Sequence, residues 1–421
     1  MFNKEKTKVI NLGCRLNFFE SEIINGILSN ERHAKKIVVN TCAVTNNAVK
    51  KSLQEVKQLA KHHPDKEIIV TGCASQLEKG LFSNLKNVSR IIDNKYKTVP
   101  DAYEFENNLS KKKYEFPELP NAESKRTRAT IQIQQGCNHR CTFCIIPYGR
   151  GDSLSLPVGE VSRRVENVLK NGFKEVILTG VDLTSYGEDL PGKPKLGNLI
   201  KRIFKLHPNL SRLRLSSIDP AEIDDDLMEL LKFEKKLMPH IHLSVQSGDN
   251  LILKRMKRRH NRETVIKVCQ DLRNHRKDIT FGADLIVGFP TETDLHFENT
   301  LDLITECEFN NVHFFPFSPR NKTPAARMKN RVDDSVASVR LAKLNQVLDK
   351  MTIDTHNKDI GSKRAVLFMY ESRKEPGFYY GRSEHFRLVK VKSKESLVGK
   401  QLGVTITGAN KTALSGVLTD I

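Results

Sequence analysis

The sequence lacks the features that would place the chain in or across a membrane. Its 421 residues contain no apolar run approaching the about 20 residues that a transmembrane helix needs. The first residues, Met1–Lys6, include no apolar segment of the kind found in secretory signal peptides. We therefore expect a cytoplasmic protein that makes no use of a membrane.

Acidic residues and cysteines are both few. Asp and Glu number 50 against 69 Lys and Arg, which gives a formal net charge of +19. Such a charge favours polyanionic partners, nucleic acid first, although it also increases solubility and does not decide between the two roles. Eight cysteines in a chain of this length, with no signal segment, favour reduced thiols and metal binding over a disulfide framework. The length predicts two or three domains.

Three of the eight cysteines form one short motif. Cys137, Cys141 and Cys144 have the spacing C-x3-C-x2-C, and the aromatic Phe143 precedes the last of them. Cysteine thiolates hold iron–sulfur clusters, and three of them can ligate three irons of a cubane and leave the fourth open to a substrate-like ligand. A zinc knuckle is the alternative, but structural zinc needs four ligands, and His139 lies between two cysteines already in use. The motif therefore predicts an iron–sulfur cluster.

The first hundred residues alternate short apolar runs with helical patterns, which predicts a parallel α/β sheet. The expected strands are 8–12, 36–40 and 67–71, and the expected helices are 18–30, one ending at 61, and 75–86. Cys14, Cys42 and Cys73 each lie just after one of these strands. Ligands bind at the carboxyl ends of the strands in such sheets, so we expect these cysteines to converge. This favours a second metal site over three buried structural cysteines.

A second α/β series follows a polar, proline-bearing linker at about 104–128. Its expected strands are 129–134, 175–178, 212–216, 240–245, 281–287 and 312–317. Six βα units predict a partial barrel with its active site at the carboxyl ends of the strands, where the loop of the cysteine motif would also lie. We expect residues there to contact a nucleoside-bearing cofactor. With Phe143, the candidates are Gly180, Asp182, Ser217, Gln246, Ser247 and Phe315.

The C-terminal part changes character after a long amphipathic helix at about 333–354. Short apolar runs separated by glycine-rich turns predict a small β-barrel over 355–421. This segment has twelve Lys and Arg against six Asp and Glu, which favours an RNA-binding module over a dimerisation or packing unit. A second basic run, 254–262, can receive phosphates or form a solvated helix face. The candidate RNA contacts are Arg255, Lys257, Arg258, Arg259, Lys390, Lys392 and Lys394.

Together these features resemble the radical-SAM methylthiotransferases, whose cofactor is S-adenosylmethionine (SAM). The resemblance covers essentially the whole chain and implies three domains: an N-terminal α/β domain at 1–120, a radical-SAM partial (β/α)6 barrel at 121–354, and a TRAM-like β-barrel at 355–421. It implies that Cys137, Cys141 and Cys144 hold a SAM-binding [4Fe-4S] cluster. It also implies that Cys14, Cys42 and Cys73 hold an auxiliary [4Fe-4S] cluster.

The residues around the cysteines resemble one subfamily in particular. The segments 13–17 and 40–45 are similar to those of the enzymes that act on threonylcarbamoyladenosine in tRNA, and the segment 146–151 is similar to that of the tRNA-directed subfamilies in general. This implies 2-methylthiolation of that nucleoside at position 37, in the anticodon loop, with a reductant such as flavodoxin or ferredoxin. The alternatives are isopentenyladenosine 37 in tRNA, a ribosomal-protein aspartate, or a non-catalytic iron–sulfur RNA-binding protein. The chain departs from the family at Asn321-Lys322, where Pro-Gly is usual, and at His260, where tyrosine is common.

Overall fold

The structure is a computed structural model that describes residues 8–29, 36–104, 113–118 and 127–419. The chain forms two compact units. The first unit contains residues 1–121, 132–156 and 318–327, and the second contains 122–131, 157–317 and 328–421. The domain boundaries expected from the sequence stay a prediction, and most of the expected linker lies outside the described residues.

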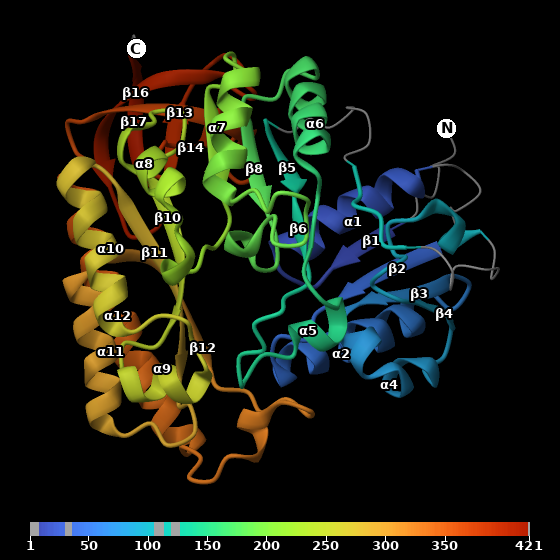
Figure 1. The fold of residues 1–421 in the computed structure, drawn as a ribbon. Helices are drawn as coiled ribbons and strands as arrows, with labels where there is room; N and C mark the ends of the chain where they lie inside the picture. Colours follow the sequence, from blue (N-terminus) through green and yellow to red (C-terminus); the bar gives the residue numbers. More distant parts are fainter. Residues whose placement is uncertain (1–7, 30–35, 105–112, 119–126, 420–421) are drawn as a thin grey trace. The chain divides into compact units, whose positions relative to one another are not determined.

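The first unit contains a four-stranded parallel sheet in the order β1-β2-β3-β4 (Figure 1). The strands are β1 (Lys8–Asn11), β2 (Lys36–Thr41), β3 (Glu67–Gly72) and β4 (Val88–Ile92). The helices are α1 (Arg15–Ile27), α2 (Asn46–His62), α3 (Cys73–Leu77) and α4 (Lys79–Ser83). Alternate residues of each strand enter different cores: Val39 packs in the core that includes α2, and Val38 in the core that includes α1. The predicted α/β sheet is confirmed.

Two local features of this sheet were not predicted. Strand β4 was missed because its polar Ser89 and Arg90 interrupt the apolar run. The single helix expected over 75–86 is two short helices, because the backbone of Glu78 (φ −131°, ψ 49°) leaves the helical conformation between them.

The remaining part of the first unit carries the cysteine motif. Strands β6 (Gln134–Gln135) and β7 (Leu154–Ser155) pair with each other, and α5 (Ile146–Arg150) lies between them in sequence. The motif occupies the loop from β6 to α5. Ile145, directly after the last cysteine of the motif, is buried in the same apolar core as α2 and β3. This contact fixes the end of the loop to the N-terminal sheet.

The second unit contains the six strands expected of a partial barrel, each within a few residues of its predicted position. They are β5 (Arg128–Gln132), β8 (Glu175–Thr179), β9 (Arg212–Leu215), β10 (His240–Gln246), β11 (Thr280–Val287) and β12 (Phe309–Pro316). The strand orders are β5-β8-β9 and β10-β11-β12, and two isolated parallel bridges involve residues of β9 and β10. The helices between them are α6 (Val158–Lys170), α7 (Leu196–Leu206), α8 (Asp225–Phe233), α9 (Asn250–Met256), α10 (Arg262–His275) and α11 (Asp294–Glu306).

After α12 (Asp334–Lys358), the chain closes a five-stranded barrel in the order β13-β14-β15-β17-β16. Its strands are β13 (Lys363–Glu371), β14 (Phe378–Arg382), β15 (Leu388–Lys392), β16 (Gln401–Ala409) and β17 (Leu414–Thr419). Its interior is an apolar core that includes Phe368, Val389 and Val404. The predicted C-terminal β-barrel is confirmed.

The C-terminal barrel packs against the amino-terminal ends of strands β9 and β10. Arg212 and Arg214, at the start of β9, both donate to the carbonyl oxygen of Ser383 in the β14–β15 loop, at 3.2 and 2.7 Å. The ring of Phe386, in the same loop, stacks on His240 at the start of β10, with centroids 5.2 Å apart. In the part of the chain that the structure describes, no helix has both the length and the apolar character needed to cross a membrane.

Candidate functional site

The three N-terminal cysteines lie at the carboxyl ends of neighbouring parallel strands. Cys14 is the N-cap of α1 after β1, Cys42 directly follows β2, and Cys73 opens α3 directly after β3. The strands β2 and β3 approach so closely at this edge that a Cβ on Gly72 would lie only 2.3 Å from the carbonyl oxygen of Thr41. Gly72 also has a φ of +99°, a conformation that favours glycine. The structure therefore brings the three cysteines to one edge, as the sequence predicted.

The electrostatics of these thiols also reflect their proximity. Burial and, to a smaller extent, the neighbouring Cys73 and Cys14 raise the pKa of the Cys42 thiol to about 11. The side-chain amide of Asn94 donates to Cys73 Sγ at 3.7 Å. The Cys14 thiol donates to Asn17 Oδ1 at 3.8 Å. The group is thus three neighbouring sulfur donors with polar side chains around them.

A buried ion cluster, formed by Glu20, Lys97 and Arg150, lies beside these cysteines. Arg150 binds both carboxylate oxygens of Glu20, at 2.9 and 3.0 Å, and Lys97 Nζ lies 2.5 Å from Oε2. Burial alone would raise the pKa of Glu20, but Arg150 and Lys97 lower it below its usual value. The cluster holds two cations and one anion, and Cys73 and Cys14 in turn raise the pKa of Arg150. This excess positive charge suits thiolates that hold a metal cluster.

The loop with Cys137, Cys141 and Cys144 is a tight turn with all three cysteines half-buried. Gly136, which precedes it, has a φ of +70°, and a Cβ there would lie 1.9 Å from the carbonyl oxygen of Asp152. Backbone hydrogen bonds join Cys137 to the carbonyl of Gly151 and Cys144 to that of Cys141, both at 3.1 Å. The motif is therefore held by its own backbone in a compact loop, which is suited to three ligands of one cluster.

Helix α5 connects the two sets of cysteines within the first unit. Its Gly149 accepts a 2.8 Å hydrogen bond from the Asn94 amide that also donates to Cys73. Its Arg150 donates to Asn17 Oδ1 at 2.6 Å and to Glu20. The chain thus passes from the last cysteine of the motif to the environment of Cys73 in five residues. This connection was not predictable from the sequence, because Glu20 and Arg150 are 130 residues apart.

The predicted cofactor contacts, apart from Phe143 in the motif, lie at or near strand ends of the second unit. Gly180 and Asp182 follow β8, Ser217 follows β9, Gln246 ends β10 with Ser247 after it, and Phe315 lies in β12. Gln246 has a φ of +77°, which is strained for a side chain with a Cβ. Backbone strain of this kind is typical of functional sites.

An ion network of Asp182, Asp219, Glu222, Arg258 and Arg259 lies at the same strand ends. Arg258 donates to Asp219 Oδ2 at 2.7 Å, and Arg259 donates to Asp182 Oδ2 at 2.6 Å and also pairs with Glu222. Two of the arginines predicted to bind RNA are therefore partners of strand-end carboxylates.

The other predicted RNA contacts are more accessible or lie on the C-terminal barrel. Lys257 is exposed at the end of α9, and Arg255 donates to Thr291. Lys390 pairs with Glu375 at 2.6 Å, while Lys392 and Lys394 are exposed. A role of any of these residues in RNA binding stays a prediction.

The two departures from the family pattern have structural counterparts. His260 is buried, with Nε2 3.0 Å from the carbonyl oxygen of Val245 and Nδ1 3.5 Å from Asp219 Oδ1. It therefore belongs to the strand-end network. Lys322, where the family usually has glycine, has a φ of +75°, a conformation that costs a residue with a Cβ about 1–2 kcal/mol.

Sequence reasoning missed a third group, formed by His242, Asp284 and His313. These side chains come from β10, β11 and β12, and Asp284 lies within hydrogen-bonding distance of both histidines. The sequence signal that could have drawn attention to His242 is the alternation of polar and apolar residues over 240–246, which places His242 on the polar face of the strand.

Two family models match the chain. The radical SAM superfamily matches residues 131–304, and a model described as uncharacterized protein family UPF0004 matches residues 6–93. The first match includes the cysteine motif and most of the six-stranded part, and the second includes the three N-terminal cysteines.

Curated relatives extend the similarity over nearly the whole chain. A threonylcarbamoyladenosine tRNA methylthiotransferase from Rickettsia prowazekii is 45% identical over 87% of this chain and 88% of its own. Its namesake from Bacillus subtilis is 32% identical over 94% and 93%. A tRNA-2-methylthio-N(6)-dimethylallyladenosine synthase from Carboxydothermus hydrogenoformans is 32% identical over 97% and 98%. The chain belongs to the radical-SAM methylthiotransferase family.

Membership of this family has consequences for chemistry and fold. A radical-SAM methylthiotransferase is a SAM-dependent radical transferase that uses a [4Fe-4S] cluster, and the closed C-terminal barrel is consistent with its TRAM domain. Among solved structures, the radical SAM methyltransferase TsrM from Kitasatospora setae has a TM-score of 0.53 at 13% identity, covering 88% of this chain and 79% of its own. This likeness concerns the fold alone.

Proposed function

We propose that this methylthiotransferase converts N6-threonylcarbamoyladenosine at position 37 of tRNA to its 2-methylthio derivative. The observation that carries the proposal is the 45% identity to a threonylcarbamoyladenosine tRNA methylthiotransferase, against 32% to a dimethylallyladenosine synthase of similar coverage. The net charge of +19 supports an RNA substrate, because a basic ribosomal protein would be repelled. A substrate in the anticodon loop and a cytoplasmic location follow from this proposal.

The two sets of cysteines are proposed as the ligands of two [4Fe-4S] clusters. Cys137, Cys141 and Cys144 would hold the SAM-binding cluster, and Cys14, Cys42 and Cys73 the auxiliary one. The three-thiolate donor sets, the close approach at Gly72 and the excess cation of the Glu20 cluster fit such groups. When bound, the clusters and SAM would supply the radical and sulfur chemistry that replaces C–H with C–SCH3, with electrons from a reductant such as flavodoxin or ferredoxin.

The chain's own residues would bind and orient the other participants. We assign SAM binding to Phe143 and to residues at or near the strand ends of the second unit. These are Gly180, Asp182, Ser217, Gln246, Ser247 and Phe315. The Arg258 and Arg259 ion pairs would hold Asp182 and Asp219 in fixed positions for this task. The exposed Lys257, Lys392 and Lys394 would contact RNA phosphates.

The cluster assignment is tested by counting iron. Anaerobically reconstituted protein should hold about eight irons per chain, as two cubanes held by thiolates. The combined Cys137→Ala, Cys141→Ala and Cys144→Ala variant should keep about half of this iron, because the N-terminal cysteines are unchanged. A matched control is Cys269→Ala, which removes a buried thiol that neither set contains. Loss of all iron from the triple variant, or zinc in place of iron in the wild type, would contradict the assignment.

The reaction is tested with two tRNA substrates in parallel, one with threonylcarbamoyladenosine and one with dimethylallyladenosine, by nucleoside mass spectrometry. We expect methylthiolation of the first and little of the second. Product from the dimethylallyl substrate alone would establish the second candidate, which the 32% identity to a synthase of that name supports. Cys42→Ala should still cleave SAM under strong reductant but form no methylthio product, whereas a non-catalytic RNA-binding protein would cleave no SAM at all.

A further inference from the structure

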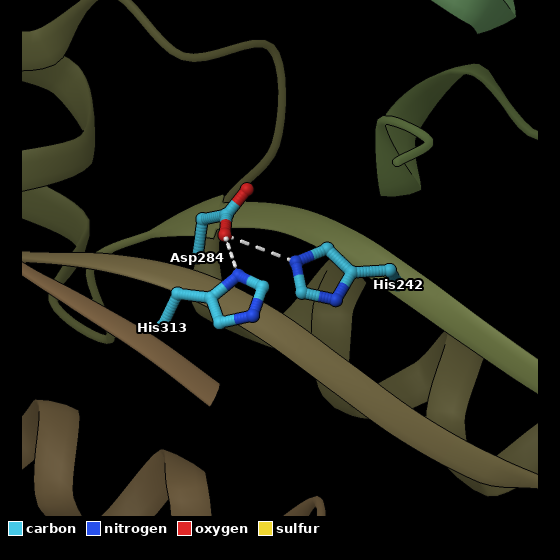
Figure 2. A group of neighbouring side chains, drawn as sticks. All are labelled: His242, Asp284 and His313. Carbon is cyan, nitrogen blue, oxygen red and sulfur yellow. Dashed lines mark hydrogen bonds and ion pairs between the residues drawn. The ribbon is translucent and has the colours of Figure 1, made fainter. Parts of the chain in front are cut away.

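Three neighbouring strands of the second unit bring His242, Asp284 and His313 together. Figure 2 shows the three side chains pointing toward one another from β10, β11 and β12. Asp284 Oδ1 lies 3.0 Å from His242 Nε2 and 2.9 Å from His313 Nδ1. One ligand atom from each residue lies within 4.8 Å of the other two. Among the residues that the structure describes, this is the one such group of three or more His, Cys, Asp or Glu.

The backbone fixes these positions without help from flexible loops. In the parallel register, Asp284 is paired with His313, and His242 with Gly282. A Cβ on Gly282 would lie 2.7 Å from His242 Nδ1 and 2.6 Å from the carbonyl oxygen of Asn311, so glycine leaves the space that the imidazole ring needs. Because strands are among the most rigid supports for a site, the three donors are held ready for a ligand.

The chemistry of the group favours a cation over an anion. Two imidazole nitrogens and one carboxylate oxygen are donors that zinc, iron(II) and related divalent ions accept, whereas the carboxylate would repel an anionic ligand. The side chain of His313 is 55% exposed, so an ion could reach the group from solvent.

We propose that His242, Asp284 and His313 bind one divalent transition-metal ion. Two ligand atoms at right angles, each about 2.1 Å from an ion, are about 3.0 Å apart, which is close to both carboxylate–imidazole distances. Three protein ligands leave coordination positions open to water or to an oxygen of a substrate. This site is separate from both cysteine sets in donor chemistry, and it does not rest on the proposed substrate.

The test uses zinc as the probe, because zinc is distinguishable from cluster iron. Holoprotein with both clusters assembled is incubated anaerobically with Zn²⁺ and desalted, and its zinc is measured by mass spectrometry and X-ray absorption. We expect about one zinc per chain, with nitrogen and oxygen ligands at about 2.0–2.1 Å and no sulfur at about 2.3 Å. Absence of retained zinc would overturn the proposal and leave a hydrogen-bonded His–Asp–His group. Sulfur ligands would equally overturn it, because they would place the zinc on cysteines.

Matched variants separate a ligand from a structural residue. Asp284→Asn preserves side-chain size, and we expect Zn²⁺ affinity to fall by more than the ~10–100-fold that loss of an outer partner costs. The control is Asp278→Asn, which removes a carboxylate bonded to a single histidine, His385, at 3.0 Å. It should keep wild-type zinc affinity. Circular dichroism establishes that each variant is folded, and His242→Gln provides a second test if Asp284→Asn is not. Equal affinity in wild type and Asp284→Asn would refute the site.

Discussion

Arginine–carboxylate ion pairs lie at both ends of the six strands in the second unit, but they have different roles at the two ends. At the amino-terminal ends, Glu175 lies between Arg212 and Arg214, at 2.9 and 3.0 Å, and all three side chains are almost fully buried. At the carboxyl ends, Asp182 and Asp219 pair with Arg259 and Arg258. Both are arginine–carboxylate networks. They differ in what covers them.

The amino-terminal network is closed by the C-terminal barrel. Arg212 and Arg214 direct their remaining donors to backbone carbonyls of the barrel, including those of Ala365, Ser383 and Glu384. In the carboxyl-terminal network the Arg259–Asp182 pair is partly accessible, whereas the side chains of Arg258 and Asp219 are almost fully buried. Arg258 also donates to the carbonyl oxygen of Ser244, two residues before the strained Gln246. In barrel folds, chemistry belongs to the carboxyl ends and stability to the amino-terminal ends. The comparison indicates that the covering barrel, more than residue type, separates the two roles here.

The largest expected effect comes from breaking the closed network. Glu175→Ala would leave Arg212 and Arg214 buried without their carboxylate, which typically costs about 3–5 kcal/mol of unfolding free energy. Denaturant unfolding measures this loss. The control is Glu166→Ala, which breaks an exposed pair with Lys170 on the surface of α6 and should lower the unfolding free energy far less, because solvent screens that pair. Equal losses in the two variants would show that the buried network has no special role.

A pH titration probes the carboxyl-terminal network. Burial raises the pKa of Asp219, but His260 and Arg258 lower it more, from its ordinary value of 3.8 to about 2. Because the folded pKa is the lower one, the carboxylate stabilises the fold above about pH 4, and this stabilisation disappears as the pH falls toward 2. The difference amounts to about 2 kcal/mol. The gap in unfolding free energy between wild type and Asp219→Asn should therefore close between pH 4 and 2, and parallel curves would contradict the assignment.

Lysines of the C-terminal barrel should affect substrate binding more than stability. Changing Lys390, Lys392 and Lys394 to Glu should raise the KM for tRNA about tenfold and reduce its salt dependence, because phosphate contacts release counterions. SAM cleavage without tRNA should be unchanged. The control makes the same charge change on α2, where Lys50, Lys51 and Lys57 are exposed. A similar rise in KM in both variants would mean that total charge, and not the barrel, attracts the RNA.

The features that were predictable from the sequence are those that follow from the order of elements along the chain. All six strands of the partial barrel were located, because their runs of β-branched and leucine residues are local signals. The convergence of Cys14, Cys42 and Cys73 was also predictable, since successive parallel strands end at one edge. The ion networks were not predictable. Glu175 and Arg212 are 37 residues apart, and in the sequence each resembles an ordinary surface charge. Only the register of the strands brings such residues together.

The smallest expected change in unfolding free energy tests whether backbone strain at the carboxyl-terminal ends serves the cofactor. Gln246 ends β10 beside a shift in the β10–β11 register, with a left-handed φ of +77°. Such a conformation costs a residue with a Cβ about 1–2 kcal/mol, and glycine avoids that cost but loses about 0.5–1 kcal/mol of chain entropy. Gln246→Gly should therefore raise the unfolding free energy by up to about 1 kcal/mol.

If the Gln246 side chain binds SAM, the same variant should raise the KM for SAM while its stability increases. The control is Glu308→Gly, at an exposed residue after α11 with a φ of +47°, which should be stabilised without any change in SAM kinetics. In Gln246→Gly, a gain in unfolding free energy should come with weaker SAM binding only if the strain serves the cofactor. A stabilised Gln246→Gly enzyme with wild-type kinetics would show that the strain results from the bulge alone, and it would remove Gln246 from the SAM site.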